Sequence, residues 1–80
     1  MEYSVRFDRY ETVQVRDDLK LHEAYYMSNS EKYEVVTDMM THLIGKPTII
    51  TKIVRDSETN EVLGYKVMGS PHIWTDEMFY

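Results

Sequence analysis

Apolar and polar residues alternate through much of the first third of the chain, and this period of two predicts half-buried β-strands. The alternating segments are residues 3–7, 11–16 and 19–22, followed by a weaker apolar run at 24–27. Val13 and Val15 fall on one face of the second segment. Residues 28–30 (Ser-Asn-Ser) favour a turn, so we expect short strands before residue 28 and a loop after it.

A helical period replaces the alternation in the middle of the chain. Apolar side chains recur there every three or four residues, at Val35, Val36, Met39, Met40, Leu43 and Ile44. Gly45 follows where a helix end favours a left-handed residue, and Pro47 prevents continuation. The pattern predicts one short helix over residues 35–43.

The last third of the chain again predicts strands. Residues 48–54 are almost all β-branched, and residues 62–68 return as a second strand after the charged turn at 56–61. Residues 72–74 form a last short strand, and we expect Thr75 to cap a single helical turn after it. Together the segments predict a mainly β (α+β) fold, a small, strongly bent antiparallel sheet or barrel with one short helix.

Length and composition narrow the class of protein. The chain has 80 residues, which suits one small domain over residues 1–80. The absence of cysteine excludes disulfides and thiolate metal sites. The charged N-terminal segment lacks the apolar stretch of a secretory signal, and no run approaches the roughly 18 apolar residues of a membrane span. We therefore expect a soluble, cytoplasmic protein with no membrane partner.

Several short motifs together carry a resemblance to a known group of proteins. They are residues 15–19 (VRDDL), 25–26 (YY), 39–40 (MM), 45–50 (GKPTII), 64–67 (GYKV) and 74–79 (WTDEMF). On these motifs, over roughly residues 13–79, the chain resembles a family of small proteins encoded by phages and prophages of Gram-positive bacteria. The closing hexapeptide is the most specific of them.

The resemblance implies a fold and a setting more than an activity. It implies a barrel of the Src-homology-3 type over residues 13–79. Trp74 is the only tryptophan and follows Ile73, so we expect it to plug the interior of the barrel, with its indole N–H bonded to backbone. Residues 1–12 depart from the family pattern and predict an extra N-terminal strand. Residues 28–35 form a longer and more charged insert, and such additions to a shared scaffold commonly carry individual function.

No motif predicts catalysis or cofactor binding. The three histidines lie far apart in sequence, and the three glycines form no phosphate-binding loop. A barrel of this size offers little room for a pocket that excludes water. We therefore expect a non-catalytic protein with no metal and no cofactor.

The charge distribution gives the best indication of function. Residues 1–44 hold nine acidic and five basic side chains, whereas residues 45–80 hold five and four. The candidate partner-binding residues are the acids Asp17, Asp18, Glu23, Glu31, Glu34 and Asp38 and the tyrosines Tyr25 and Tyr26. Such a face could mimic the phosphates of nucleic acid and bind, inhibit or modulate a host protein with a basic or nucleic-acid-binding surface. The plainer interpretation is a solvated acidic face that keeps a small domain soluble.

Two other functions stay open at this point. A structural module would self-associate or dock in a phage complex, for example as a homodimer that buries Tyr3, Val5 and Phe7. A weak nucleic-acid-binding barrel would use the local basic patch of Lys46, Lys52, Arg55 and Lys66. The net charge of −5 disfavours nucleic acid as a partner.

Overall fold

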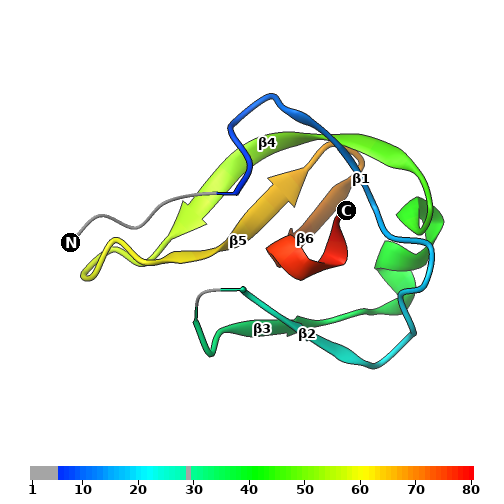
Figure 1. The fold of residues 1–80 in the computed structure, drawn as a ribbon, viewed down its shortest axis with the longest axis horizontal. Helices are drawn as coiled ribbons and strands as arrows, with labels where there is room; N and C mark the ends of the chain where they lie inside the picture. Colours follow the sequence, from blue (N-terminus) through cyan, green and yellow to red (C-terminus); the bar gives the residue numbers. More distant parts are fainter. Residues whose placement is uncertain (1–5, 29) are drawn as a thin grey trace.

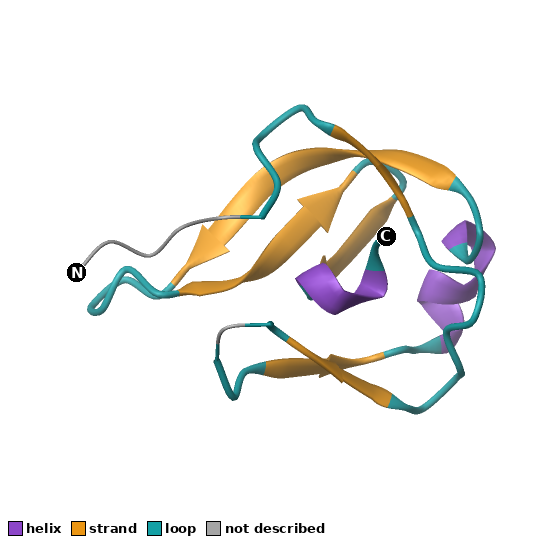
Figure 2. Cartoon of the chain, in the orientation of Figure 1, coloured by secondary structure: helices purple, strands orange, loops and turns teal. Residues whose placement is uncertain are grey.

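A computed structural model describes residues 6–28 and 30–80, and this part of the chain is mainly β (Figures 1 and 2). In chain order its elements are β1 (Thr12–Gln14), β2 (Ala24–Tyr26), β3 (Tyr33–Val35), the 3₁₀ helix η1 (Asp38–Leu43), β4 (Pro47–Arg55), β5 (Val62–Val67), β6 (Ser70–Trp74) and the 3₁₀ helix η2 (Asp76–Met78). The strands form a four-stranded and a two-stranded antiparallel sheet. The mainly β class predicted from the sequence is therefore confirmed.

The β-branched strand β4 organises the larger sheet, whose order is β1-β4-β5-β6. It pairs with β1 at its first half, where Val13 lies opposite Thr48, and with β5 along its second half, where Ile53 lies opposite Tyr65. The β4–β5 register shifts between Ile50 and Lys52, and such irregularities bend a sheet and increase its twist. The sheet curves over the core as a result (Figure 1).

Large aromatic and sulfur-containing side chains fill the core between this sheet and the two short helices. Trp74 stacks on Phe79 at 6.0 Å between ring centroids. Phe7 meets the rings of Tyr65 and Phe79 edge-on at 5.8 and 5.5 Å. Met40 of η1 is also fully buried, so the sequence's high content of aromatic residues and methionine serves packing in part.

The sheet does not close into a barrel within the described residues. After β6 the chain returns to β1 through η2, and Phe79 then forms a single bridge with Val15. The Tyr80 backbone N–H adds one hydrogen bond of 3.0 Å to the carbonyl of Gln14. Because η2 occupies Asp76–Met78, only these last residues lie in register with β1, which is too little for a strand ladder.

The predicted helix is shorter than expected and begins later. Val35 is the last residue of β3, where it pairs with Ala24, and the Val36 N–H donates to the Glu23 carbonyl at 3.1 Å. These contacts with β2 outweigh the helical spacing of the two valines, whose branched side chains also favour strands. The helix begins at Asp38 and is a 3₁₀ helix throughout.

Details at the helix ends confirm one expectation and correct two. Gly45 follows η1 with a φ of +77°, the left-handed conformation expected there. Thr75 precedes η2, but its hydroxyl donates to the Tyr25 carbonyl at 3.0 Å instead of capping the helix. Trp74 is fully buried as expected, but its indole N–H donates to the Ser70 hydroxyl at 3.2 Å and not to backbone.

The N-terminal segment differs from the strand predicted over residues 1–12. Residues 1–5 lie outside the described part of the chain, and residues 6–11 form bends and turns. Phe7 is buried in the core, so this residue is not available to a dimer interface. The Tyr10 N–H donates to the Ile50 carbonyl at 2.6 Å, and this hydrogen bond holds residues 6–11 against β4.

Residues 19–22 do not continue the alternation as a strand. Leu19 is buried, but Leu21 is exposed. His22 adopts a φ of +68° and donates its N–H to the Val36 carbonyl at 2.8 Å. The chain therefore turns here to enter β2.

Candidate functional site

The β2–β3 hairpin carries the most distinctive surface of the molecule. It lies across the core from β4, on the other side of η2 (Figure 1). Its register pairs Ala24 with Val35, Tyr25 with Glu34, and Tyr26 with Tyr33. Because paired residues share a face and successive residues alternate, Tyr26, Tyr33 and Val35 lie on one face, and Tyr25 and Glu34 lie on the other.

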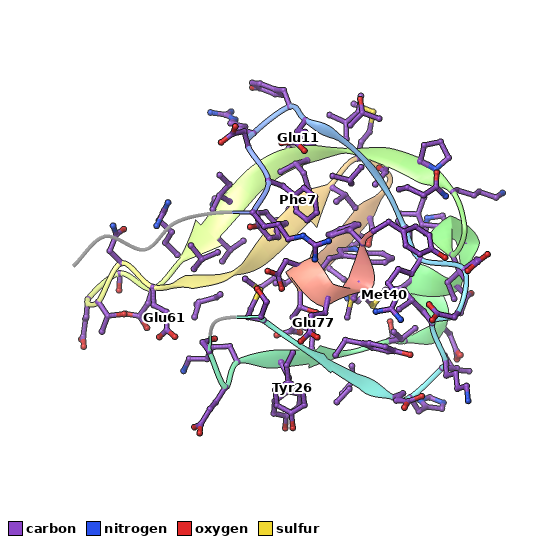
Figure 3. The ribbon with its side chains drawn as sticks, viewed as in Figure 1. Phe7, Glu11, Tyr26, Met40, Glu61 and Glu77 are labelled. Carbon is purple, nitrogen blue, oxygen red and sulfur yellow. The ribbon has the colours of Figure 1, made fainter. Side chains whose placement is uncertain are left out.

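The first of these faces, which we call the outer hairpin face, is aromatic and open to solvent. Tyr26 is 48% exposed, Tyr33 53% and Val35 37%. The two tyrosine rings lie 5.3 Å apart between centroids with 43° between their planes. Figure 3 shows Tyr26 pointing away from the body of the protein. Exposed aromatic pairs of this kind supply rigid contact area to a partner at a low entropic cost.

The opposite face of the hairpin turns inward. Tyr25 packs against the core, and its hydroxyl accepts a hydrogen bond of 2.9 Å from the Lys20 N–H. Glu34, its register partner, is half-buried. Of the two adjacent tyrosines predicted to bind a partner, the structure thus exposes Tyr26 and directs Tyr25 toward the interior.

A buried carboxylate fixes the end of β2 against η2. Asp76 is 2% exposed, and its two oxygens accept the Ser28 N–H at 2.9 Å and the Ser28 hydroxyl at 2.5 Å. The hydrogen bond from Thr75 to the Tyr25 carbonyl adds a third link. The outer hairpin face is therefore held in a fixed position relative to the core, which lowers the cost of ordering it on binding.

Two of the predicted acidic residues are engaged within the chain. Arg16 donates to both oxygens of Asp18, at 2.9 and 2.7 Å, and these hydrogen bonds lower the pKa of the Asp18 carboxyl. Asp17 accepts the Tyr80 hydroxyl at 2.5 Å, and this bond raises the pKa of the Tyr80 phenol. Both carboxylates remain exposed, but each already accepts hydrogen bonds within the chain, which leaves less of its charge for a partner.

The other predicted acids border the hairpin. Glu23 precedes β2, Glu31 lies in the turn that joins the two strands, and Asp38 begins η1 shortly after β3. All three are exposed, whereas Glu34 is half-buried on the inner side. Of the predicted tyrosines only Tyr26 therefore lies on the outer hairpin face, beside Tyr33. The exposed acids Glu23, Glu31 and Asp38 lie in the segments next to the hairpin strands.

Tyr33 belongs to this surface and escaped the sequence interpretation. Its role depends on pairing with Tyr26, and that pairing follows from β3, which the sequence assigned partly to the helix. The alternation of apolar, charged and apolar residues over Tyr33–Val35 was the available sequence signal, but three residues are too few to establish a period.

The basic residues considered for nucleic-acid binding are only partly brought together. Lys52 of β4 lies directly opposite Lys66 of β5. Lys46 precedes β4, and Arg55 ends it with a hydrogen bond of 3.1 Å to the Asn60 carbonyl. Of these four basic residues, only Lys52 and Lys66 are therefore paired directly across the sheet.

Within residues 6–28 and 30–80, no three histidine, aspartate or glutamate side chains are placed to hold a metal ion. No helix of the described residues is long and apolar enough to cross a membrane. Comparisons with models of known families, with curated proteins and with solved structures found no match. The resemblance to phage proteins stays a prediction, and the candidate site rests on geometry alone.

Proposed function

We propose that the chain is a non-catalytic accessory protein of phage origin that binds a host bacterial protein through the outer hairpin face and inhibits or modulates it. The observation that carries the proposal is the exposed pair Tyr26 and Tyr33, in contact with each other at the surface. Tyrosine is enriched among residues that dominate binding energy, because one rigid side chain offers both apolar area and a hydroxyl.

The charge around the tyrosines indicates the chemistry of the partner. Residues 17–38 contain six acidic side chains and two lysines. Glu23 immediately precedes β2, Glu31 lies in the turn between β2 and β3, and both are exposed. An acidic rim around an aromatic centre fits a basic surface, such as the nucleic-acid-binding face of a cytoplasmic host protein, and speeds association with it.

Affinity capture of the tagged full chain from a Gram-positive lysate, washed at low and high salt, would identify the partner. Binding is then measured with the purified partner. The double variant Tyr26→Ser/Tyr33→Ser is expected to weaken it at least tenfold, or about 1.4 kcal/mol, since tyrosine is enriched among the residues whose truncation costs more than about 1 kcal/mol. Tyr10→Ser is the matched control, because Tyr10 is also exposed but lies beside β4.

The electrostatic part of the proposal has its own pair of variants. Glu23→Lys/Glu31→Lys reverses two exposed acids beside the hairpin, and Asp8→Lys/Glu11→Lys makes the same change of charge before β1. The first is expected to slow association and remove most of the salt dependence, whereas the second is expected to act weakly. Equal effects of the two double variants would contradict an interface at the hairpin.

A second candidate function, self-association or docking in a phage assembly, is favoured by one separate observation. An open hollow of about 390 Å³ lies beside β4 and is lined by Thr12, Leu43, Pro47, Thr48, Ile49 and Met68. Met68 is 60% exposed at its rim. If this surface joins two copies, light scattering of the full chain would give twice the monomer mass, and Met68→Glu would restore the monomer.

A further inference from the structure

The four-stranded sheet places two lysines directly opposite each other on its solvent side. Lys52 of β4 is the register partner of Lys66 of β5. Tyr65 and Val67, on either side of Lys66, are buried in the core. Since successive strand residues point to opposite faces, Lys66 and its partner project outward. We call these two residues the lysine pair.

Such an arrangement is unfavourable unless an anion is nearby. Residues directly opposite in an antiparallel pair have Cβ atoms about 4.5–5.5 Å apart, and like charges at this distance repel. Within residues 6–28 and 30–80 the one ion pair joins Arg16 to Asp18, so neither lysine is neutralised there by a carboxylate. In a chain with 14 acidic and only 9 basic side chains, this local positive charge points to an anionic ligand.

A third cation and an aromatic ring lie at the edge of the lysine pair. Arg9 donates from Nε to the carbonyl of Thr51, next to Lys52, at 3.2 Å. An open hollow of about 310 Å³ is lined by Arg9, Thr51, Lys52 and Ile53. The Arg9 guanidinium carbon lies 4.8 Å from the ring centroid of Tyr10. Arg9 thus lines the hollow and contacts the aromatic ring of Tyr10.

The backbone holds Tyr10 in an unusual position. Its φ is +71°, a left-handed conformation that bulky residues rarely adopt, and its N–H donates to Ile50 at 2.6 Å. The side chain is left 67% exposed, where a planar ligand could stack on it. Backbone strain that keeps an aromatic ring in solvent is more typical of a binding surface than of packing.

We infer that Arg9, Tyr10, Lys52 and Lys66 form a binding site for single-stranded nucleic acid, in which the cations contact successive phosphates and the Tyr10 ring stacks on a base. The cations come from three segments of the chain, the loop before β1, β4 and β5, and a row of phosphates along a strand can contact all three. The exposed ring suits unpaired bases, whose faces are free to stack. The inference goes beyond the proposed function, because β4 and the β2–β3 hairpin lie on opposite sides of the molecule (Figure 1).

The test measures fluorescence anisotropy of a labelled 20-nucleotide oligothymidylate with the full chain. Three phosphate contacts to a single strand predict a slope of about −2 for log K against log salt, or roughly 20-fold weaker binding between 50 and 200 mM salt. Tyr10→Ser is expected to weaken binding about fivefold or more, as loss of one stacked base does.

Charge reversal with a matched control separates the site from net charge. Lys52→Glu/Lys66→Glu is expected to weaken binding at least tenfold. Lys20→Glu/Lys32→Glu makes the same change of charge near the hairpin and is expected to stay within about twofold. Equal weakening by the two double variants, or no binding of the oligonucleotide at 50 mM salt, would overturn the inference.

Two further measurements keep the test decisive. The single variant Lys52→Glu converts the like-charge pair into an opposite-charge pair, so it should melt no lower than the natural chain while still binding the oligonucleotide less well.

Competition with inorganic tripolyphosphate tests the other source of phosphate. Tight tripolyphosphate binding together with no effect of Tyr10→Ser would assign the site to free polyphosphate and overturn the nucleic-acid assignment. Tyr26→Ser should leave oligonucleotide binding unchanged, so the two proposed surfaces can fail separately.

Discussion

Asp76 and Ser28, 48 residues apart, form a polar link between η2 and the β2–β3 hairpin: both carboxylate oxygens of the buried Asp76 accept hydrogen bonds from Ser28. The link joins the end of β2 to the first residue of η2. It holds the hairpin that carries Tyr26 and Tyr33 to the part of the chain that packs Trp74. The sequence motif Trp-Thr-Asp at 74–76 thus combines a core aromatic residue with the anchor of the candidate binding surface.

Removing the Asp76 carboxylate is expected to destabilise the fold strongly. Hydrogen bonds to charged groups contribute about 1.5–3 kcal/mol, so Asp76→Ala should lower the free energy of unfolding by roughly 3 kcal/mol. Asp76→Asn keeps one acceptor oxygen and should cost about half as much. Urea denaturation followed by fluorescence of Trp74, the single tryptophan, measures both.

Glu77→Gln supplies the control for the same helical turn, since Glu77 is only half-buried and its side chain has no hydrogen bond among the described residues. We expect a change within about 0.5 kcal/mol for it. A double-mutant cycle with Ser28→Ala should show coupling between the two residues. Additive effects of Ser28→Ala and Asp76→Asn would contradict the link.

The central strands were predictable because their pattern is local. The β-branched run at 48–54 and the strand at 62–68 correspond to β4 and β5, with bounds that differ by one residue at most. Burial of these strands on one or both sides favours apolar residues along most of their length, and such runs are readily recognised in the sequence. The mainly β class follows from these segments alone.

The hairpin and the candidate sites depended on pairing between distant residues. Val35 has helical spacing with Met39, and only its pairing with Ala24 assigns it to β3. The β2–β3 register determines whether Tyr25 or Tyr26 faces solvent, because a shift of the register by one residue would exchange the two faces of the strand. Likewise, Lys52 and Lys66 become neighbours only through the β4–β5 ladder. Local sequence patterns do not contain this information.

Gly64 is expected to tolerate no side chain. A Cβ at this position would lie 2.5 Å from Ile73 Cγ2 and 2.8 Å from the Trp74 carbonyl oxygen. The first neighbour is a side chain that can move, but the second is backbone of the paired strand. Gly64→Ala should therefore destabilise the protein by about 1–3 kcal/mol, the usual cost of overpacking a well-packed core.

Thermal unfolding of Gly64→Ala alone and in combination with Ile73→Ala separates the two clashes. Relief of the side-chain contact should recover part of the loss beyond the cost of Ile73→Ala itself. Full stability of the single variant would mean that β5 and β6 lie farther apart than described.

The contact between Tyr80 and Asp17 predicts a shifted titration. The hydrogen bond to the carboxylate favours the protonated phenol and raises the pKa of Tyr80 above its ordinary value near 10. The contribution of this bond to stability is therefore complete below pH 10, and it is lost as the pH rises through the raised pKa. Asp17→Ala should return the titration of Tyr80 toward 10, as followed by NMR of the tyrosine ring carbons.

Tyr65 serves as an internal reference in this experiment. Burial raises the pKa of its phenol too, but by desolvation and without any contact with Asp17. Asp17→Ala should leave the Tyr65 titration in place. A Tyr80 titration unchanged by the substitution would show that the Asp17 contact does not persist in solution.

The exposed pair Tyr26 and Tyr33 is expected to matter little for stability. Cross-strand aromatic pairs contribute about 0.2–1 kcal/mol, and roughly half of each side chain is already in contact with water. A double-mutant cycle of Tyr26→Ser and Tyr33→Ser, measured by urea denaturation, should give a coupling energy in that range. The double variant should stay folded, with its Trp74 fluorescence unchanged.

This small cost makes the binding experiment interpretable. If Tyr26→Ser/Tyr33→Ser unfolds the protein, the two rings act in packing and the outer hairpin face loses its main support as an interface. If the variant stays folded but no longer binds the captured partner, the loss is assigned to the surface itself. Because Asp76 and Thr75 hold the hairpin through Ser28 and Tyr25, contacts that neither ring makes, we expect the second result.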